Sequence, residues 1–393
     1  MKLNNIKLLK IIKPIWYLYL ETKDEKQYWV NYTNLSDDHK HYIDYYNCYE
    51  DKKTAMLDVS YQAWQKGYIV NSRNFNSAGD IDHNLSLFDQ YIFIKRMFKP
   101  LWARLVFIYR LLTFCNPIKE IKAFFKTQKI NQININHPNF EPKGYIEFQS
   151  KLVEQSPMIS IIIPTLNRYL LLKDSLQDLQ KQEYTNFEVI IVDQSTDFDK
   201  LFYDQFNLDI NLIHQKVPGL WKARNLAIRN ARGEYILFFD DDSRIGSDWI
   251  KEHLKSIDYF KADLSAGVSI SKVGDSIPEH YNYFRLADQL DTGNVLIKLE
   301  VFKKCGLFDL QFEGMRMGDG EFGARAYING FKSINNPKAW RLHLKGSTGG
   351  LRDMGSWDGM RPMKWFSVRP VPSILYYFRK YWGNRAALYK IIQ

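Results

Sequence analysis

From residue 158 onward, short apolar runs alternate along the chain with segments whose apolar residues recur every three or four positions. The run Met158–Ile163 predicts a buried strand that ends before Pro164, and the leucine spacing of Leu170–Gln182 predicts an amphipathic helix after it. Two more apolar runs, Glu188–Val192 and Glu234–Phe239, predict further buried strands. Strands that alternate with helices in this way indicate an α/β fold with a largely parallel sheet.

A second helix is predicted over Ala223–Ala231. Gly233 is placed to end it, because a glycine just past a helix adopts the left-handed conformation without strain. Two of the predicted strands end in acidic residues, since Asp193 follows one and Asp240 follows the next. Ligands in open α/β sheets bind in the crevice beyond the carboxyl ends of the strands. We therefore expect a binding site at that edge of the sheet.

The pattern before residue 157 is different, since Tyr, Asn and Lys are frequent there and the periodicity is mixed. The chain is therefore divided into three parts. They are an N-terminal region of unknown role over residues 1–150, which includes basic, aromatic helices, an α/β domain over 157–350, and a basic, aromatic extension over 351–393.

The composition fits a cytoplasmic protein with an anionic partner. The 393 residues are enough for two domains of ordinary size. The three cysteines show no CxxC spacing, which disfavours a zinc site or a disulfide framework and fits a reducing compartment. A net charge of +10 indicates a phosphate-bearing or otherwise anionic partner. No run of about 18 uncharged apolar residues predicts a transmembrane helix.

Asp240, Asp241 and Asp242, here called the acidic triplet, directly follow a predicted buried strand. Neighbouring carboxylates repel one another, and their partial burial is unfavourable without a cation. Mg²⁺ and Mn²⁺ prefer carboxylate oxygens and keep coordination positions open for phosphate oxygens. The alternative interpretation is a plain acidic loop before a helix that Ser243 or Ser247 caps.

Five segments of the chain resemble, in order, the motifs of the inverting glycosyltransferase family 2, whose members have the GT-A fold. The segments are Met158–Arg168, Ile190–Asp197, Gly219–Asn225, Phe238–Asp242 and Asp319–Gly330. The resemblance implies an α/β domain with a Rossmann-like mixed sheet and flanking helices. It also implies a metal-dependent enzyme that moves a sugar from a nucleotide sugar to an acceptor hydroxyl with inversion at the anomeric carbon.

The same resemblance implies which residues bind the donor and the metal. The donor-binding residues would be Pro164, Thr165, Arg168, Asp193, Arg224, Asp240 and Asp241. Among them, Asp193 would accept a hydrogen bond from the nucleobase, such as uracil, and Asp240 would bind the ribose. Arg224 would lie near the diphosphate or hold Asp240. Asp242 and His343 would bind Mn²⁺ or Mg²⁺.

On the acceptor side, the resemblance implies that Asp319 is the general base that deprotonates the attacking hydroxyl. Glu321, two residues later, is the alternative base. Two positions depart from the family pattern, since Gly318 stands where Glu is usual and Gln194 stands where a second acid is common. The departure at Gln194 weakens the expectation of a uridine nucleotide.

We expect a hexosyltransferase that uses a nucleotide sugar, with a UDP-sugar as the first choice. Its acceptor would be a saccharide or a lipid-linked saccharide in surface polysaccharide or glycolipid synthesis. The alternative is a catalytically inactive scaffold or saccharide-binding subunit of the same fold. A nucleotidyltransferase or a dinucleotide-dependent dehydrogenase would need a glycine-rich phosphate loop after the first strand, and Pro164–Arg168 contains no glycine.

Two segments, residues 90–130 and 361–393, combine many lysines and arginines with aromatic residues. They are interpreted as contacts with an anionic membrane surface, which would place a cytoplasmic protein on the inner face of the membrane. Ordinary helix packing with a solvated basic face is the alternative. No nucleic-acid-binding motif is present, so nucleic acid is not expected as a partner.

Overall fold

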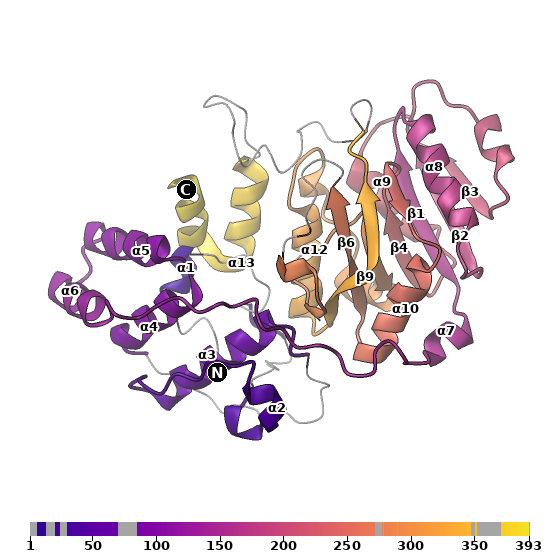
Figure 1. Cartoon of the computed structure of the whole chain (residues 1–393). Helices are drawn as coiled ribbons and strands as arrows, with labels where there is room; N and C mark the ends of the chain where they lie inside the picture. The colour runs from indigo at the N-terminus through magenta and orange to yellow at the C-terminus, as the bar shows by residue number, and fades with distance from the viewer. Residues whose placement is uncertain are drawn as a thin grey trace. The chain divides into compact units, whose positions relative to one another are not determined.

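A computed structural model of the chain is shown in Figure 1. It describes residues 6–12, 20–23, 30–69, 85–271, 277, 279–288, 290–346, 350–351 and 371–392. The chain packs into two compact units. One unit combines Met1–Glu141 with Phe378–Gln393, and the other is Pro142–Tyr377. The domain boundaries predicted from composition stay predictions.

The larger unit is built on a nine-stranded mixed sheet in the order β3-β2-β1-β4-β8-β6-β9-β5, with β7 paired to β9. Its first four strands are parallel, whereas β8 runs antiparallel to both β4 and β6. The predicted Rossmann-like mixed α/β sheet is confirmed. The strands are β1 Ile159–Thr165, β2 Phe187–Asp193, β3 Ile210–His214, β4 Tyr235–Phe239, β5 Ser243–Ile245, β6 Leu264–Ser271, β7 Arg285–Leu286, β8 Asn294–Lys298 and β9 Ser333–His343.

Helices cover both faces of this sheet. On one face, α8 and α10 pack apolar side chains against alternate residues of β1, such as Ile161. On the other face, Phe238 of β4 contacts Phe302 of α11, which stacks on Phe322 of α12. The α-helices and 3₁₀ turns of this unit are α7 Lys151–Gln155, α8 Tyr169–Gln180, η4 Leu201–Gln205, α9 Leu220–Arg229, α10 Trp249–Phe260, η5 Glu279–Tyr281, α11 Leu299–Cys305, η6 Leu310–Phe312 and α12 Gly318–Ile328.

Two local predictions were wrong. Strand β1 continues through Pro164, which pairs with Val192 of β2. Its pairing with β4 ends earlier, at Ile162, so the missing N–H of proline is not needed on that side. Gly233 does not end α9, because the helix already stops at Arg229. Gly233 instead lies so close to β1 that a Cβ there would be 2.5 Å from the Ser160 nitrogen.

The described part of the smaller unit is mostly helical. Its described elements are α1 Leu9–Ile12, η3 Tyr32–Asn34, α2 Asp37–Lys40, α3 Lys52–Gln65, α4 Leu87–Met97, α5 Pro100–Leu112 and α6 Pro117–Lys126. The last helix, α13 Val371–Ile392, begins in the larger unit and is interrupted at Gly383, where φ is 82°. A buried ion pair of 2.7 Å between Arg96 and Asp58 joins α4 to α3. Among the described helices, none is long and apolar enough to cross a membrane.

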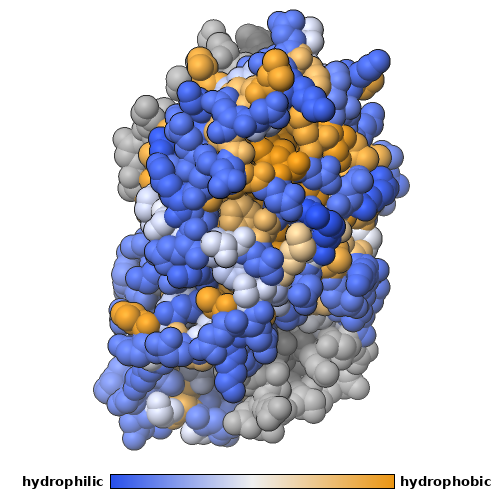
Figure 2. Space-filling view, turned by 90° about the vertical axis from the view of Figure 1, so that its right-hand side faces the viewer, coloured by the Kyte–Doolittle hydropathy of each residue, from blue (hydrophilic) through white to orange (hydrophobic). Residues whose placement is uncertain are grey.

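Strand β3 lies at one edge of the sheet, at the right in Figure 1. Figure 2 turns this side of the molecule to the viewer and shows a hydrophobic patch surrounded by hydrophilic residues. Apolar side chains of β3, among them Ile210 and Leu212, are only partly buried against the core. The core of the larger unit is therefore less completely covered at this edge than in its centre.

A buried polar network joins His253 of α10 to Ser265 of β6 and Asn294 of β8. The Nδ1 of His253 lies 2.9 Å from the Ser265 hydroxyl, and its Nε2 donates to the Asn294 side-chain oxygen at 3.0 Å. Asn294 in turn donates to the carbonyls of Val268 and Ala339 and accepts from the Trp249 indole. Burial lowers the pKa of His253 to about 4.

We predict that this histidine makes the larger unit sensitive to mild acid. The unfolded chain binds the His253 proton near pH 6.5, whereas the folded chain binds it only near pH 4. Its contribution is therefore complete above pH 6.5 and decreases as the pH falls, by up to about 3 kcal/mol. The melting temperature of the wild type should decrease as the pH is lowered from neutral to mildly acidic values. The melting temperature of His253→Gln should decrease less over the same pH range. Parallel pH profiles would contradict the assignment.

Candidate active site

The acidic triplet lies where β4 leaves the core. Ser243, directly after it, begins β5 and pairs antiparallel with His343 at the end of β9. The amide of Leu344 also donates to the Asp242 carbonyl at 2.8 Å. This pairing brings His343 beside Asp242, although about a hundred residues of chain separate them.

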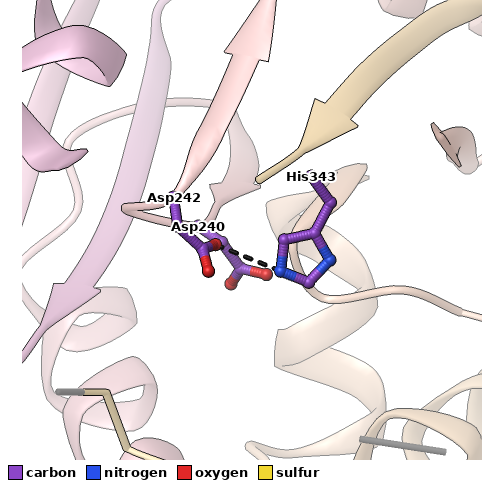
Figure 3. A group of neighbouring side chains, drawn as sticks. All are labelled: Asp240, Asp242 and His343. Carbon is purple, nitrogen blue, oxygen red and sulfur yellow. Dashed lines mark ion pairs between the residues drawn. The ribbon is translucent and has the colours of Figure 1, made fainter. Parts of the chain in front are cut away.

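Asp240, Asp242 and His343 form a group that could hold a metal ion (Figure 3). One ligand atom from each lies within 4.8 Å of the others, and the three side chains point toward one another. His343 Nε2 is 3.1 Å from Asp242 Oδ1. Carboxylate oxygens suit Mn²⁺ and Mg²⁺, whereas an imidazole nitrogen suits transition metals, so the group could hold a divalent ion. The geometry thus unites the two predicted metal ligands with Asp240, for which a ribose contact was predicted, and the individual roles stay predictions.

Three arginines from different elements hold the acidic triplet. Arg224 of α9 donates to Asp240 Oδ1 at 3.2 Å, and Arg341 of β9 donates to Asp240 Oδ2 at 2.8 Å. Arg168, at the start of α8, donates to Asp241 at 3.3 Å and to Asp242 at 3.2 Å. Of the two positions that the sequence left open for Arg224, the structure therefore shows the contact with Asp240.

Arg341 was missed by the sequence analysis. Its side chain is 1% exposed and also donates to Ser269, Ser243 and Asp291 at 2.7–2.9 Å. Although burial opposes ionisation, the charge of Arg341 lowers the pKa of Asp291 to about 2. A sequence signal was available, because alternate strand residues share a face and Arg341 stands two positions before His343.

Gly293 is a further residue that only the structure reveals. A Cβ at this position would lie 2.1 Å from Asp240 Oδ2 and 2.4 Å from Arg341 Nη2. The carbonyl of Thr292, next to it, accepts from Arg224 at 2.9 Å. The two buried arginines therefore converge on this turn before β8, and a side chain at Gly293 would separate Arg341 from Asp240.

The surroundings of the acidic triplet raise the pKa of Asp241 and lower the pKa of Asp242. Burial raises the pKa of Asp241 to about 7, although Arg168 opposes the shift and Thr165 donates to the carboxyl at 2.7 Å. Burial acts in the same direction on Asp242, but the hydrogen bond and charge of His343, with Arg168 and Arg341, lower its pKa well below the ordinary value. Thr165 and Arg168, both predicted donor-binding residues, thus contact the acidic triplet.

Asp193, at the end of β2, is fully buried among protein donors. It accepts from the hydroxyls of Tyr169 at 2.6 Å and Tyr203 at 2.8 Å, and from the amide of Ser195 at 2.8 Å. These contacts stabilise the turn after β2, and neither tyrosine was singled out from the sequence. Pro164 is buried within β1. The predicted contacts of Asp193 and Pro164 with a nucleotide stay predictions.

The two candidate bases lie in the first turn of α12 but in different environments. Asp319 is partly exposed and accepts from the amide of Gly320 at 2.7 Å. Glu321 is fully buried, and Arg325 donates to it at 2.8 Å. Arg325 also donates to two backbone carbonyls. Glu321 is therefore part of the packing of α12, whereas Asp319 can be reached from solvent.

Helix α9 connects the acidic triplet to the start of α12. Its Trp221 ring lies 5.1 Å from the Arg224 guanidinium and donates to the Phe312 carbonyl at 2.9 Å. A Cβ at Gly318 would lie 2.5 Å from the same ring. The departure from the family pattern at Gly318 thus has a physical reason, because Trp221 occupies the space that a Glu side chain would need.

A mixed α/β sheet with an acidic, histidine-containing group beyond the carboxyl end of β4 is an arrangement that could bind a phosphate-bearing ligand through a metal ion. Residues 160–317 match the family model described as Glycosyl transferase family 2. Over these residues the chain is similar to glycosyl transferase family 2. The match includes the acidic triplet, Arg168 and Arg224, whereas Asp319, Arg341 and His343 lie beyond it.

The chain is similar to parts of longer curated glycosyltransferases. The poly(ribitol-phosphate) beta-N-acetylglucosaminyltransferase TarS of Staphylococcus aureus is 31% identical over 112 residues, which are 27% of this chain and 20% of that protein. Glycosyltransferase GlyA of Streptococcus pneumoniae serotype 4 is 28% identical over 194 residues, 44% of this chain and 27% of that protein. The crystal structure of S. aureus TarS 1-349 in complex with UDP-GlcNAc aligns with a TM-score of 0.43 and 22% identity, over 51% of this chain and 62% of that one.

We predict that Arg341 is required for the stability of the site. Arg341→Met would leave Asp291 without its arginine and Asp240 with Arg224 alone, which should lower the free energy of unfolding by about 2–3 kcal/mol. Lys251 of α10 offers a control, because it pairs with Glu183 at 2.7 Å and both side chains are exposed, by 38% and 50%.

Lys251→Met should therefore lower the free energy of unfolding by no more than about 1 kcal/mol. Melting midpoints of the two variants, measured without nucleotide or metal, compare these effects directly. Equal midpoints would show that Arg341 does not hold the site together.

Proposed function

We propose that the chain is an inverting, metal-dependent glycosyltransferase that moves a sugar from a nucleotide sugar to an acceptor hydroxyl. The observation that supports this proposal most is the group of Asp240, Asp242 and His343 within a family 2 domain. In parallel α/β sheets, the carboxyl ends of the strands are where phosphate-bearing ligands bind. A cation-binding group at that edge fits a diphosphate leaving group.

On the donor side, Asp242 and His343 would hold Mn²⁺ or Mg²⁺, with Asp240 beside them. The ion would neutralise negative charge on the departing nucleoside diphosphate. The nucleoside would lie beyond the carboxyl ends of β1 and β2, where the buried side chains of Thr165 and Asp193 would hold the backbone around it. Arg168 is 16% exposed, whereas the side chains of the other two arginines are 1% exposed, so Arg168 is the arginine that a diphosphate could reach.

On the acceptor side, we assign Asp319 as the general base. A base must reach the proton of the attacking hydroxyl, and Asp319 is partly exposed. Glu321 is less suitable, because it is buried and already paired with Arg325. Direct attack with one base inverts the configuration at the anomeric carbon. No covalent intermediate is needed.

We propose a UDP-sugar as the donor and a saccharide or lipid-linked saccharide as the acceptor, in polysaccharide or glycolipid synthesis. The relative from S. aureus is a beta-N-acetylglucosaminyltransferase, which supports transfer of N-acetylglucosamine by a related domain. The chain covers at most 27% of that relative or of GlyA, so donor, acceptor and linkage need direct measurement. UDP, GDP, dTDP and CDP, each with and without Mn²⁺, should be compared by thermal shift.

We predict that Asp242→Asn abolishes the stabilisation by UDP that depends on Mn²⁺. The substitution removes one charge from the metal group and leaves the side-chain volume almost unchanged. Asp209→Asn is the matched control, because Asp209 is 58% exposed and pairs with Arg232 away from the acidic triplet. The control should keep the full metal-dependent shift. If the wild type shows no shift with any nucleotide and metal, the inactive scaffold becomes the better interpretation.

We predict that Asp319→Asn retains nucleotide binding and lowers the transfer rate by about 10²–10⁴-fold. Transfer can be followed as release of UDP from the UDP-sugar that gives the largest thermal shift, with a panel of saccharide acceptors. Glu321→Gln is the comparison variant. Glu321→Gln should lower the melting temperature, because Arg325 loses a buried partner. The molecules that remain folded should still transfer sugar. A fast Asp319→Asn enzyme together with an inactive but folded Glu321→Gln enzyme would reverse the assignment.

A further inference from the structure

Helix α5 of the smaller unit carries an apolar stripe that faces solvent. Its packed face is formed by Ala103 and Val106, which are buried. The opposite stripe recurs at intervals of four, three and four residues, the spacing of one helix face. Its members are between 46% and 73% exposed and are Leu101, Leu105, Ile108 and Leu112.

Helix α6 and the turn before it continue this stripe. Ile118, Ile121 and Phe125 recur at intervals of three and four residues and are 76%, 46% and 55% exposed. In the turn, Phe114 is 97% exposed and has a φ of 56°, a conformation that bulky residues rarely adopt. A glycine or asparagine is usual at such a position, so an exposed ring held there indicates a function other than folding.

The same segment is strongly basic. Between Gln90 and Phe140 the only acidic residue is Glu120, and it is buried and bound by Arg110 at 2.7 Å. Several exposed cations remain around the apolar stripe. They are Lys99, Arg104, Lys119, Lys122 and Lys129.

The inner sides of α5 and α6 pack against each other and against α4, and the exposed stripe takes no part in these contacts. The hydroxyl of Tyr91 on α4 donates to Glu120 on α6 at 2.9 Å. Phe107 on α5 stacks on Phe124 on α6 with ring centroids 4.3 Å apart. Lys95 donates to the Phe124 carbonyl at 2.8 Å. These contacts hold α5 and α6 in place, so the outer apolar residues are available for a partner.

We infer that the α5–α6 surface, defined by Leu101, Leu105, Ile108, Leu112, Phe114, Ile118, Ile121 and Phe125, binds the interface of an anionic phospholipid bilayer. Its apolar side chains would enter the acyl boundary while the surrounding lysines and arginines meet lipid phosphates. With 13 and 10 residues, the two helices are too short to cross a bilayer and would lie along its surface. This inference does not depend on the proposed sugar transfer.

The full chain should co-sediment with vesicles of phosphatidylcholine mixed with phosphatidylglycerol. It should bind phosphatidylcholine vesicles more weakly, and added salt should reduce the difference. Ile118→Ser should lower the vesicle-bound fraction on the order of tenfold. The matched control is Ile146→Ser in the larger unit, since Ile146 is 77% exposed and Ile118 is 76% exposed. The control should bind vesicles like the wild type.

A second variant tests the role of charge. Lys119→Gln should weaken binding to the anionic vesicles about fivefold and leave binding to phosphatidylcholine unchanged. Melting midpoints should be equal for all three variants, because each side chain is exposed. The inference is overturned if the wild type ignores anionic vesicles, or if Ile146→Ser weakens binding as much as Ile118→Ser. It is also overturned if the wild type self-associates without vesicles and Ile118→Ser makes it monomeric, because a second copy would then be the partner.

Discussion

Three adjacent carboxylates at the end of a buried strand are the constraint on which the rest of the site depends. The acidic triplet follows β4 directly, and its members would repel one another if they were left without cations. Arg168, Arg224 and Arg341 neutralise it from the start of α8, from α9 and from β9. The positions of these three elements are therefore linked through one electrostatic cluster. The end of β1, which runs parallel to β4, and the start of β8, which runs antiparallel to it, therefore lie at the same edge of the sheet as the acidic triplet.

The three arginines are not equivalent. Arg224 and Arg341 are buried and donate hydrogen bonds to different oxygens of Asp240, which orients this carboxylate toward Asp242 and His343. Such supporting contacts are how proteins hold a binding group ready before its ligand arrives. Arg168 is more exposed and spans Asp241 and Asp242. The buried pair thus stabilises the fold of the site, whereas Arg168 is partly accessible to solvent.

Helix α9 serves both sides of the site. Arg224 reaches the acidic triplet, while Trp221 on the preceding turn packs beside Gly318 at the start of α12. Asn225 exchanges two hydrogen bonds of 2.9 Å with the backbone of Phe308. The donor-side acids and the proposed base at Asp319 are therefore connected through one helix. The exposed α5–α6 surface is a separate property, carried by the other unit.

Sequence alone determined the α/β class and the order of β1, α8, β2, α9 and β4, because apolar periodicity is local. Short motifs also singled out Asp240, Asp242 and His343, which the structure brings together, and Asp319, whose role stays a prediction. Sequence alone did not determine that Arg341 and Gly293 belong to the site, or that Trp221 takes the space of the missing Glu at position 318. Those contacts join segments about fifty to a hundred residues apart. The pairing of β5 with β9 and the turn before β8 decide them, and such pairings become visible only when the sheet is assembled.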